Sequence, residues 1–231
     1  MTGMPPSASI APVLTARGLT VTRPGDAGPL RVLDSIDLTL AVGTLTDVVG
    51  PSGSGKTTLL LALSRLLPEV EGALSLAGVP AAEVDASVWR TRVAYLPQRS
   101  ALLSGTVLDN LLLPWRLKVR AAEAAPTPEQ LRAALGRVRM DDVALDRSST
   151  RLSEGQCARV ALLRTVLTRP EVLLLDEPDA SLDNESAEQV GLLTSEFVAG
   201  GGAVVRVRHL RSDDRADRRL HLESGRLTEA S

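Results

Sequence analysis

The sequence predicts an α/β fold with a mixed, mostly parallel sheet, an N-terminal antiparallel β portion and an inserted helical lobe. Three observations predict it. A short β-branched run, Thr44 to Val49, enters a Gly-rich loop that a helical stretch follows. The continuous apolar run from Val172 to Leu175 is typical of a central parallel strand, which is buried on both faces. Between Gln98 and Arg151 the pattern becomes mostly helical, with prolines as punctuation, which indicates a helical lobe at about 99–152.

Composition is that of an ordinary globular protein. The chain has 231 residues, 44% of them hydrophobic and only 2% aromatic, so Leu, Val and Ala must build the core. The net charge of −2 gives no reason to expect a nucleic-acid partner. A signal peptide is not evident, and no apolar run approaches the roughly 20 residues of a membrane-spanning helix. The single cysteine, Cys157, excludes an intrachain disulfide and fits a reducing, cytoplasmic compartment.

Turn and helix-breaking residues place the elements of the first part of the chain. Residues 1–11 are rich in Pro, Ser and Ala, so we expect a disordered tail there and a single domain over 12–231. A Pro/Gly turn separates two strand-like segments near the start of this domain, and Pro68 halts the first helix. The elements expected here are strands over Val13–Thr22, Arg31–Leu40, Gly72–Leu76 and Val93–Leu96 and a helix over Thr57–Leu67.

Helix-capping patterns place the elements of the second part. Thr127 followed by Pro128 is a good helix start. Ser153 with Gln156 three residues later forms a capping box. The elements expected here are helices over Pro128–Met140, from Ser153 to about Thr168 and over Ala187–Val198, a strand over Ala203–Val207 and a strand-turn-strand over Leu220–Leu227.

The Gly-rich loop matches the phosphate-binding pattern G-x-x-x-x-G-K-[ST] in full, and it lies between a strand and a helix as that pattern requires. Its residues are Gly50, Pro51, Ser52, Gly53, Ser54, Gly55, Lys56 and Thr57, and Thr58 follows. Glycines let the backbone N–H groups point at the phosphates, and the helix N-terminus adds its partial positive charge. We expect Lys56 to reach the β- and γ-phosphates and the Thr57 hydroxyl to ligate Mg²⁺.

Two carboxylates end the buried strand that starts at Val172. Such strand-end carboxylates face the phosphate loop across neighbouring strand ends. Asp176 suits the Mg²⁺ shell, directly or through water, and Glu177 suits polarising the attacking water. The sequence therefore predicts an enzyme that binds and hydrolyses a nucleoside triphosphate with Mg²⁺.

Six motifs in order give the chain its resemblance to the ATP-binding subunits of ABC (ATP-binding cassette) transporters. They are the phosphate loop, Gln98, Leu152–Gln156, Asp176-Glu177, Ser181-Leu182-Asp183 and His209. The resemblance covers about Leu14 to Leu227 and implies a P-loop NTPase core. It also implies that a complete active site needs two such subunits, a homodimer, at the cytoplasmic face of a membrane.

The resemblance assigns roles to further residues. Gln98 would touch Mg²⁺ or the water and sense the membrane partner. Ser153, Gly155 and Gln156 would contact the γ-phosphate bound to the opposite subunit, which agrees with the anion preference of a helix N-terminus. His209 would hydrogen-bond the γ-phosphate, and Asp183 would contact the opposite subunit's phosphate loop.

Two departures from the family pattern stand out. No aromatic residue lies near the end of the first strand, where the family stacks one on adenine. Arg23 is there instead, and either it stacks its planar guanidinium on the base or it is a solvated turn residue. Glu154 replaces a common Gly, and because a phosphate would repel its carboxylate, its side chain must point away from the nucleotide.

Residues Leu103–Leu111 and Leu113-Pro114-Trp115 resemble a small bacterial group of ATPase subunits linked to iron export or metal resistance. The partner this implies is a separate membrane permease. Trp115 either anchors that permease or packs inside the helical lobe. Two other functions remain open: a soluble ABC ATPase of DNA repair or translation, and a nucleotide-binding regulator without hydrolysis. A single cassette without long insertions argues against the first, and the intact Lys56, Asp176, Glu177 and His209 argue against the second.

Overall fold

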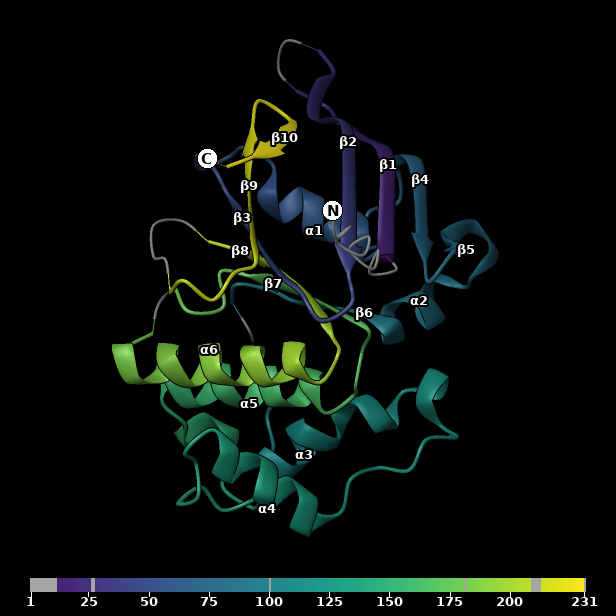
Figure 1. Cartoon of the computed structure of the whole chain (residues 1–231). Helices are drawn as coiled ribbons and strands as arrows, with labels where there is room; N and C mark the ends of the chain where they lie inside the picture. Colours follow the sequence, from purple (N-terminus) through teal and green to yellow (C-terminus); the bar gives the residue numbers. More distant parts are fainter. Residues whose placement is uncertain (1–11, 26–27, 100, 181, 209–212, 231) are drawn as a thin grey trace, which may run out of the picture.

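Two β-sheets enclose the first helix in the computed structural model of this chain (Figure 1). The structure describes residues 12–25, 28–99, 101–180, 182–208 and 213–230. The expected disordered tail therefore lies outside the described residues, as do Ser181 and His209.

The smaller sheet is antiparallel and has the strand order β2-β1-β4-β5. Its central strand β1 pairs antiparallel with both β2 and β4. The strands are β1 (Pro12–Arg23), β2 (Leu30–Ala41), β4 (Glu71–Leu76) and β5 (Val79–Pro80). This sheet confirms the predicted N-terminal antiparallel portion.

The larger sheet is mostly parallel, with the order β10-β9-β3-β8-β7-β6. Its strands are β3 (Leu45–Val49), β6 (Val93–Leu96), β7 (Val172–Asp176), β8 (Ala203–Val207), β9 (Arg218–Glu223) and β10 (Arg226–Glu229). Only β10 pairs antiparallel, at the edge. Because β3, β6, β7 and β8 run parallel, the loops that follow them meet at one edge of the sheet.

Strand β7 is central and completely buried, as its unbroken apolar run predicts. Val172 and Leu174 pack into the core between the two sheets, together with the helix α1 (Lys56–Leu63). Leu173 and Leu175 pack into a second core, under the helices α5 (Glu154–Val166) and α6 (Asn184–Ala199). The alternation of a strand therefore places one core on each face of the larger sheet.

The helices before β6 differ from the prediction in two ways. The first helix ends at Leu63 rather than Leu67, because Arg65 adopts a left-handed backbone (φ +56°) before Pro68 is reached. The short helix α2 (Ala86–Arg92) was not predicted at all. Asp85 caps it, and its Trp89 is fully buried with Nε1 donating to the Leu63 carbonyl at 3.0 Å.

The inserted lobe contains less regular helix than its sequence indicated. It holds α3 (Val107–Leu112) and α4 (Pro128–Arg137), with 3₁₀ turns at Leu113–Arg116 and Lys118–Arg120. The helix α4 stops before the predicted Met140, and Arg139 has a φ of +52°. Figure 1 shows this lobe beyond α5 and α6, on the side away from the small sheet. No helix in the described part of the chain has the length and apolar character to cross a membrane.

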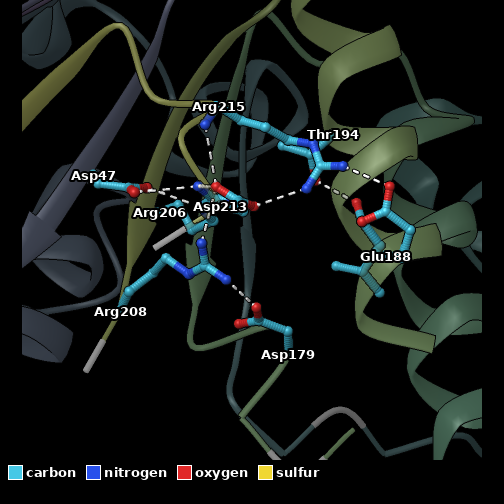
Figure 2. A network of polar contacts seen from close by, with 9 residues as sticks. Asp47, Asp179, Glu188, Thr194, Arg206, Arg208, Asp213 and Arg215 are labelled. Carbon is cyan, nitrogen blue, oxygen red and sulfur yellow. Dashed lines mark hydrogen bonds and ion pairs between the residues drawn. The ribbon is translucent and has the colours of Figure 1, made fainter. Parts of the chain in front are cut away.

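A buried network of ion pairs crosses the larger sheet (Figure 2). Arg206 on β8 makes paired hydrogen bonds of 2.8 and 3.1 Å with Asp47 on β3, and two of 2.8 Å with Asp213. Arg206 and Asp47 are each 2% exposed in their side chains. Burial raises the pKa of Asp213, but hydrogen bonds from Arg206 and the charges of Arg206 and Arg208 outweigh it and hold that pKa well below the ordinary value.

We expect Asp213 to make the stability of the protein sensitive to acid. A carboxyl with a lowered folded-state pKa stabilises the fold above its unfolded pKa of about 3.9, and this contribution is lost as the pH falls through the folded value. Asp213→Asn should therefore lower the free energy of unfolding at about pH 7, with the difference from the unsubstituted chain shrinking below about pH 4. Urea unfolding at several pH values measures it. A difference that stays constant down to about pH 3 would contradict the assignment.

Candidate functional site

A cavity of about 510 Å³ opens where the phosphate loop meets the ends of β6 and β7. It gathers residues from segments that are far apart in the sequence. Its lining is Arg23, Val32, Ser52, Gly53, Gly55, Lys56, Thr57, Thr58, Gln98 and Glu177. All but Val32 are predicted site residues, so the structure brings these together at the expected edge of the sheet.

The backbone of the phosphate loop requires glycine at two places. Gly50 has a φ of +154°, and a Cβ there would lie 2.1 Å from the Leu222 carbonyl oxygen on β9. Gly55 is the N-cap of α1 with a φ of +101°, and no side chain caps the helix. The first-turn N–H groups of α1 are therefore available to an anion such as a phosphate.

Lys56 is 6% exposed and folds back over its own loop. Its Nζ donates to the carbonyl oxygens of Gly50 at 2.9 Å and Pro51 at 2.8 Å. Burial lowers the pKa of Lys56, while the charges of Glu177 and Asp176 act in the opposite direction. The lysine thus lies within electrostatic reach of both strand-end carboxylates, as the sequence predicted.

Asp176 is the last residue of β7 and is 4% exposed. Its Oδ2 accepts a hydrogen bond of 3.1 Å from the hydroxyl of Tyr95 on the neighbouring strand β6. Burial, together with the charge and hydrogen bond of Asp176, raises the pKa of Tyr95 well above its ordinary range. Tyr95 was missed by the sequence analysis. Its position three residues before Gln98 was the available signal.

Glu177 has a left-handed backbone, with a φ of +48°. Its N–H donates to the Val207 carbonyl at 3.2 Å, and its Oε2 accepts from Gln98 Nε2 at 2.9 Å. A non-glycine residue in this region is strained by about 1 kcal/mol, and such strain clusters at functional sites. The tight turn directs the carboxylate into the cavity beside Gln98 and the phosphate loop.

The oxygen atoms here suit Mg²⁺. The Thr57 hydroxyl is exposed to the cavity, and the Asp176 carboxylate and Gln98 amide come from adjacent strand ends. Across the described residues, no group of three or more His, Cys, Asp and Glu could form an all-protein metal cage. A few hard oxygen donors fit Mg²⁺, which keeps water and binds substrate phosphates alongside one or two carboxylates.

The predicted capping box at the start of α5 is present. Ser153 Oγ accepts from Gln156 N at 3.2 Å, and Gln156 Oε1 accepts from Ser153 N at 3.0 Å. A Cβ on Gly155 would lie 2.4 Å from the Oγ of Ser186, so glycine lets α5 approach the first turn of α6 closely. Asp183 caps α6 by accepting from Ser186 N at 2.7 Å, a bond that lowers the pKa of Asp183.

The Ser153 end of α5 does not line the phosphate-loop cavity. A second cavity of about 390 Å³ lies between α5 and the residues after β7, and it is lined by Glu154, Cys157 and Leu182 as well as Gln98 and Glu177. Glu154 lines this second cavity and not the phosphate-loop cavity. Among the described residues, the phosphate loop and the start of α5 therefore line different cavities, and Gln98 and Glu177 border both.

The structure also places Arg23 and Trp115, for each of which the sequence left two alternatives open. Arg23 is exposed and borders the phosphate-loop cavity beside Val32. Trp115 is half-buried and borders a groove of about 920 Å³ between the inserted lobe and α6, together with Pro126 and Phe197. It is neither enclosed in the lobe nor fully exposed.

The sequence of this chain is similar to those of known proteins. The family model described as "ABC transporter" matches residues 33–180. The chain belongs to the ABC transporter family. It is 31% identical to the "Probable iron export ATP-binding protein FetA" of Escherichia coli, over 88% of this chain and 91% of that protein. It is 38% identical to the "Hemin import ATP-binding protein HmuV" of Nocardia farcinica, over 93% of this chain and 75% of that protein.

Other similar proteins differ in length. "Protein STAR1" of Oryza sativa is 38% identical over 80% of this chain, which spans about half (51%) of that protein. Among solved structures, the dimeric post-hydrolysis state of the ATP-binding cassette MJ0796 bound to ADP and Pi has a TM-score of 0.78 at 24% identity and covers 94% of this chain and 98% of that one. The ABC membership confirms the predicted ATPase, and the structural likeness confirms the predicted fold.

Proposed function

We propose that this ABC ATPase hydrolyses ATP at two sites shared between paired subunits and drives a separate membrane permease from the cytoplasmic face. One observation supports it most. The phosphate loop, Gln98 and Glu177 line one cavity, whereas the capped Ser153 end of α5 lies outside it. A second subunit is the simplest source of the missing anion-binding helix end.

In the proposed site the phosphate loop binds ATP. The N–H groups at the start of α1 hold the phosphates, and Lys56 exchanges its bonds to Gly50 and Pro51 for the β- and γ-phosphate oxygens. Thr57, Asp176 and Gln98 would hold Mg²⁺, which when bound neutralises phosphate charge. Tyr95 orients the Asp176 carboxylate through its hydroxyl.

Glu177 is the proposed base that orients and polarises the attacking water. Gln98 donates to its Oε2 at 2.9 Å, which holds the carboxylate at the phosphate-loop cavity that both residues line. Gln98 also stands where the inserted lobe begins, so a movement of the lobe reaches Glu177 directly. The family resemblance adds His209, which would hydrogen-bond the γ-phosphate.

The opposite subunit would complete each site. Ser153, Gly155 and Gln156 present the N-terminus of α5, whose dipole and N–H groups favour a phosphate. Asp183, at the start of α6, would contact the other subunit's phosphate loop. Two solved structures of the cassette MJ0796, which has this fold, are described as dimeric, which supports the pairing.

Arg23 is the proposed contact for the nucleotide base. It borders the phosphate-loop cavity from the end of β1, and a guanidinium plane can stack on a purine. Stacking reads no hydrogen-bond pattern, so we expect weaker preference for ATP over GTP than an enclosed base pocket would give.

The proposed cargo is a metal ion, moved outward. The segment Leu103–Trp115 resembles iron-export and metal-resistance ATPases, and a relative matched over nearly its whole length is named for iron export. Other relatives are named for hemin import, cobalt import and lipoprotein release, so this part of the proposal rests on that segment. The groove beside Trp115 would receive the permease.

Transport in inverted membrane vesicles tests this function. Vesicles carrying the chain and the membrane protein that co-purifies with it should accumulate Fe²⁺ when ATP is supplied, and should not do so with ADP. Vesicles with the Glu177→Gln chain serve as the control and should accumulate none. ATP hydrolysis that the membrane protein stimulates, without Fe²⁺ uptake, would exclude metal export. Absence of any stimulation would exclude the transport role.

A further inference from the structure

The ion-pair network of Figure 2 reaches the loop after Glu177 through Arg208. Arg208 follows β8, and its guanidinium contacts Asp179 through one nitrogen and lies 3.0 Å from Asp213 through another. Arg208 is 5% exposed, and Asp179 is 9% exposed. This pair therefore joins two segments, 29 residues apart in the sequence, inside the protein.

The position of this pair relates it to the proposed site. Asp179 lies two residues after Glu177, and the same loop leads to Asp183 at the start of α6. On the other side, the N–H of Arg208 donates at 3.1 Å to the carbonyl of Val48, on the strand β3 that leads into the phosphate loop. The pair thus connects residues 178–180 with the strand end before the phosphate loop.

A second connection runs beside the ion pair. The N–H of Glu177 donates to the Val207 carbonyl at 3.2 Å, so backbone and side chain both tie this loop to the end of β8. Asp213, which Arg206 and Arg208 share, holds the guanidinium of Arg208 from the opposite side. With Arg208 between Asp179 and Asp213, the described residues directly after Glu177, 178–180, are tied to the end of β8.

Buried ion pairs add little net stability compared with apolar packing, but they penalise every arrangement in which the charges separate. The pair does not touch the phosphate-loop cavity, whose lining includes neither Arg208 nor Asp179. Its loss should therefore displace Asp179 and the residues beside it and leave nucleotide binding by one subunit unchanged.

We propose that Arg208 is a positioning residue that, through Asp179 and the 3.3 Å bond from Leu182 N to the Asp179 carbonyl, holds residues 178–180 and the start of α6 in the position required for two ATP-bound subunits to pair. This rests on the proposed function, in which Asp183 and Glu177 act at the subunit interface. Arg208 itself contacts no substrate.

The test compares the full-length chains with Arg208→Met, Asp179→Asn and Arg208→Lys. For each chain, ATP affinity is measured on the single subunit, kcat and KM in the hydrolysis assay, and ATP-driven dimerisation by light scattering in a Glu177→Gln background. We expect Arg208→Met to lower kcat about tenfold and to raise the subunit concentration for half-dimerisation by a similar factor, because small misplacements at a reacting site have effects of this size or larger. ATP affinity of the single subunit should stay within about twofold, since binding contacts are intact.

Glu188→Gln is the matched control, because it breaks the 2.7 Å pair with Arg215 in the same network without touching Asp179. Glu188→Gln should change neither kcat nor dimerisation. Arg208→Lys, which keeps the positive charge, should retain part of the kcat and part of the dimerisation that Arg208→Met loses. A lower melting temperature in Arg208→Met with unchanged kcat and dimerisation would overturn the positioning role. Asp179→Asn decides the matter if Arg208→Met does not fold. If the chain that carries Glu177→Gln and no second substitution fails to dimerise with ATP, the proposed function itself is wrong.

Discussion

Glu177→Gln should bind ATP normally and hydrolyse it at least about 100-fold more slowly, because a carboxylate acting as general base contributes about 10²–10⁴ in rate. Glutamine keeps the size of the side chain and the left-handed backbone but cannot accept the proton from water. Without turnover, the proposed dimer should accumulate with ATP enclosed. Phosphate release measures the rate, and light scattering with ATP and with ADP measures the dimer.

Glu223→Gln is a suitable control for this variant, since Glu223 is an exposed carboxylate on β9 outside both cavities. It should leave turnover unchanged. Hydrolysis by Glu177→Gln at the rate of the unsubstituted chain would mean that another group is the base.

Ser153→Arg should abolish ATP-driven dimerisation and reduce turnover at least about 100-fold, as expected when a stabilising contact to a reacting phosphate is lost. The long side chain would block the helix end that is proposed to meet the opposite γ-phosphate. ATP affinity of the single subunit should be unchanged, because Ser153 does not line the phosphate-loop cavity. Equilibrium nucleotide binding and light scattering separate the two effects.

Thr127→Arg is the matched control for the loss of a helix cap. Thr127 caps α4 with the same kind of capping box that Ser153 makes for α5. Both substitutions should therefore cost about 1 kcal/mol of stability. Only Ser153→Arg should lose dimerisation. An equal loss in both variants would show that destabilisation of the lobe, and not a contact across subunits, causes the effect.

Local patterns predicted much of this architecture. The capping box at Ser153 depends on residues three apart and is present as expected, and a helix starts after Thr127 as predicted. The apolar run of β7 and the phosphate-loop pattern depend on neighbours too, so the strand, the loop and the start of the following helix were predicted correctly. The strand-end position of Asp176 and Glu177 came from the same run.

Features that depend on residues distant in sequence were not predictable. The carbonyl of Leu222 that requires glycine at position 50 comes from the far end of the chain. Arg206 stands inside an apolar strand, and its partner Asp47 is 159 residues away. Nothing in the sequence indicates the left-handed backbone of Glu177, because glycine is the residue that usually adopts this conformation. Contacts between distant strands determine the glycine at position 50, the Arg206–Asp47 pair and the backbone of Glu177. Sequence periodicity does not encode such contacts.

The contrast between the two tryptophans has a spectroscopic consequence. Trp89 is fully buried against α1, with Arg65 5.8 Å from its ring, whereas Trp115 borders the groove beside the inserted lobe. With Trp89 replaced by Phe, the intrinsic fluorescence of the protein would come from a single indole at the proposed permease groove. The emission of Trp115 would shift to shorter wavelength when a partner excludes water there. A chain with this one substitution would therefore report docking of the proposed permease without an added label.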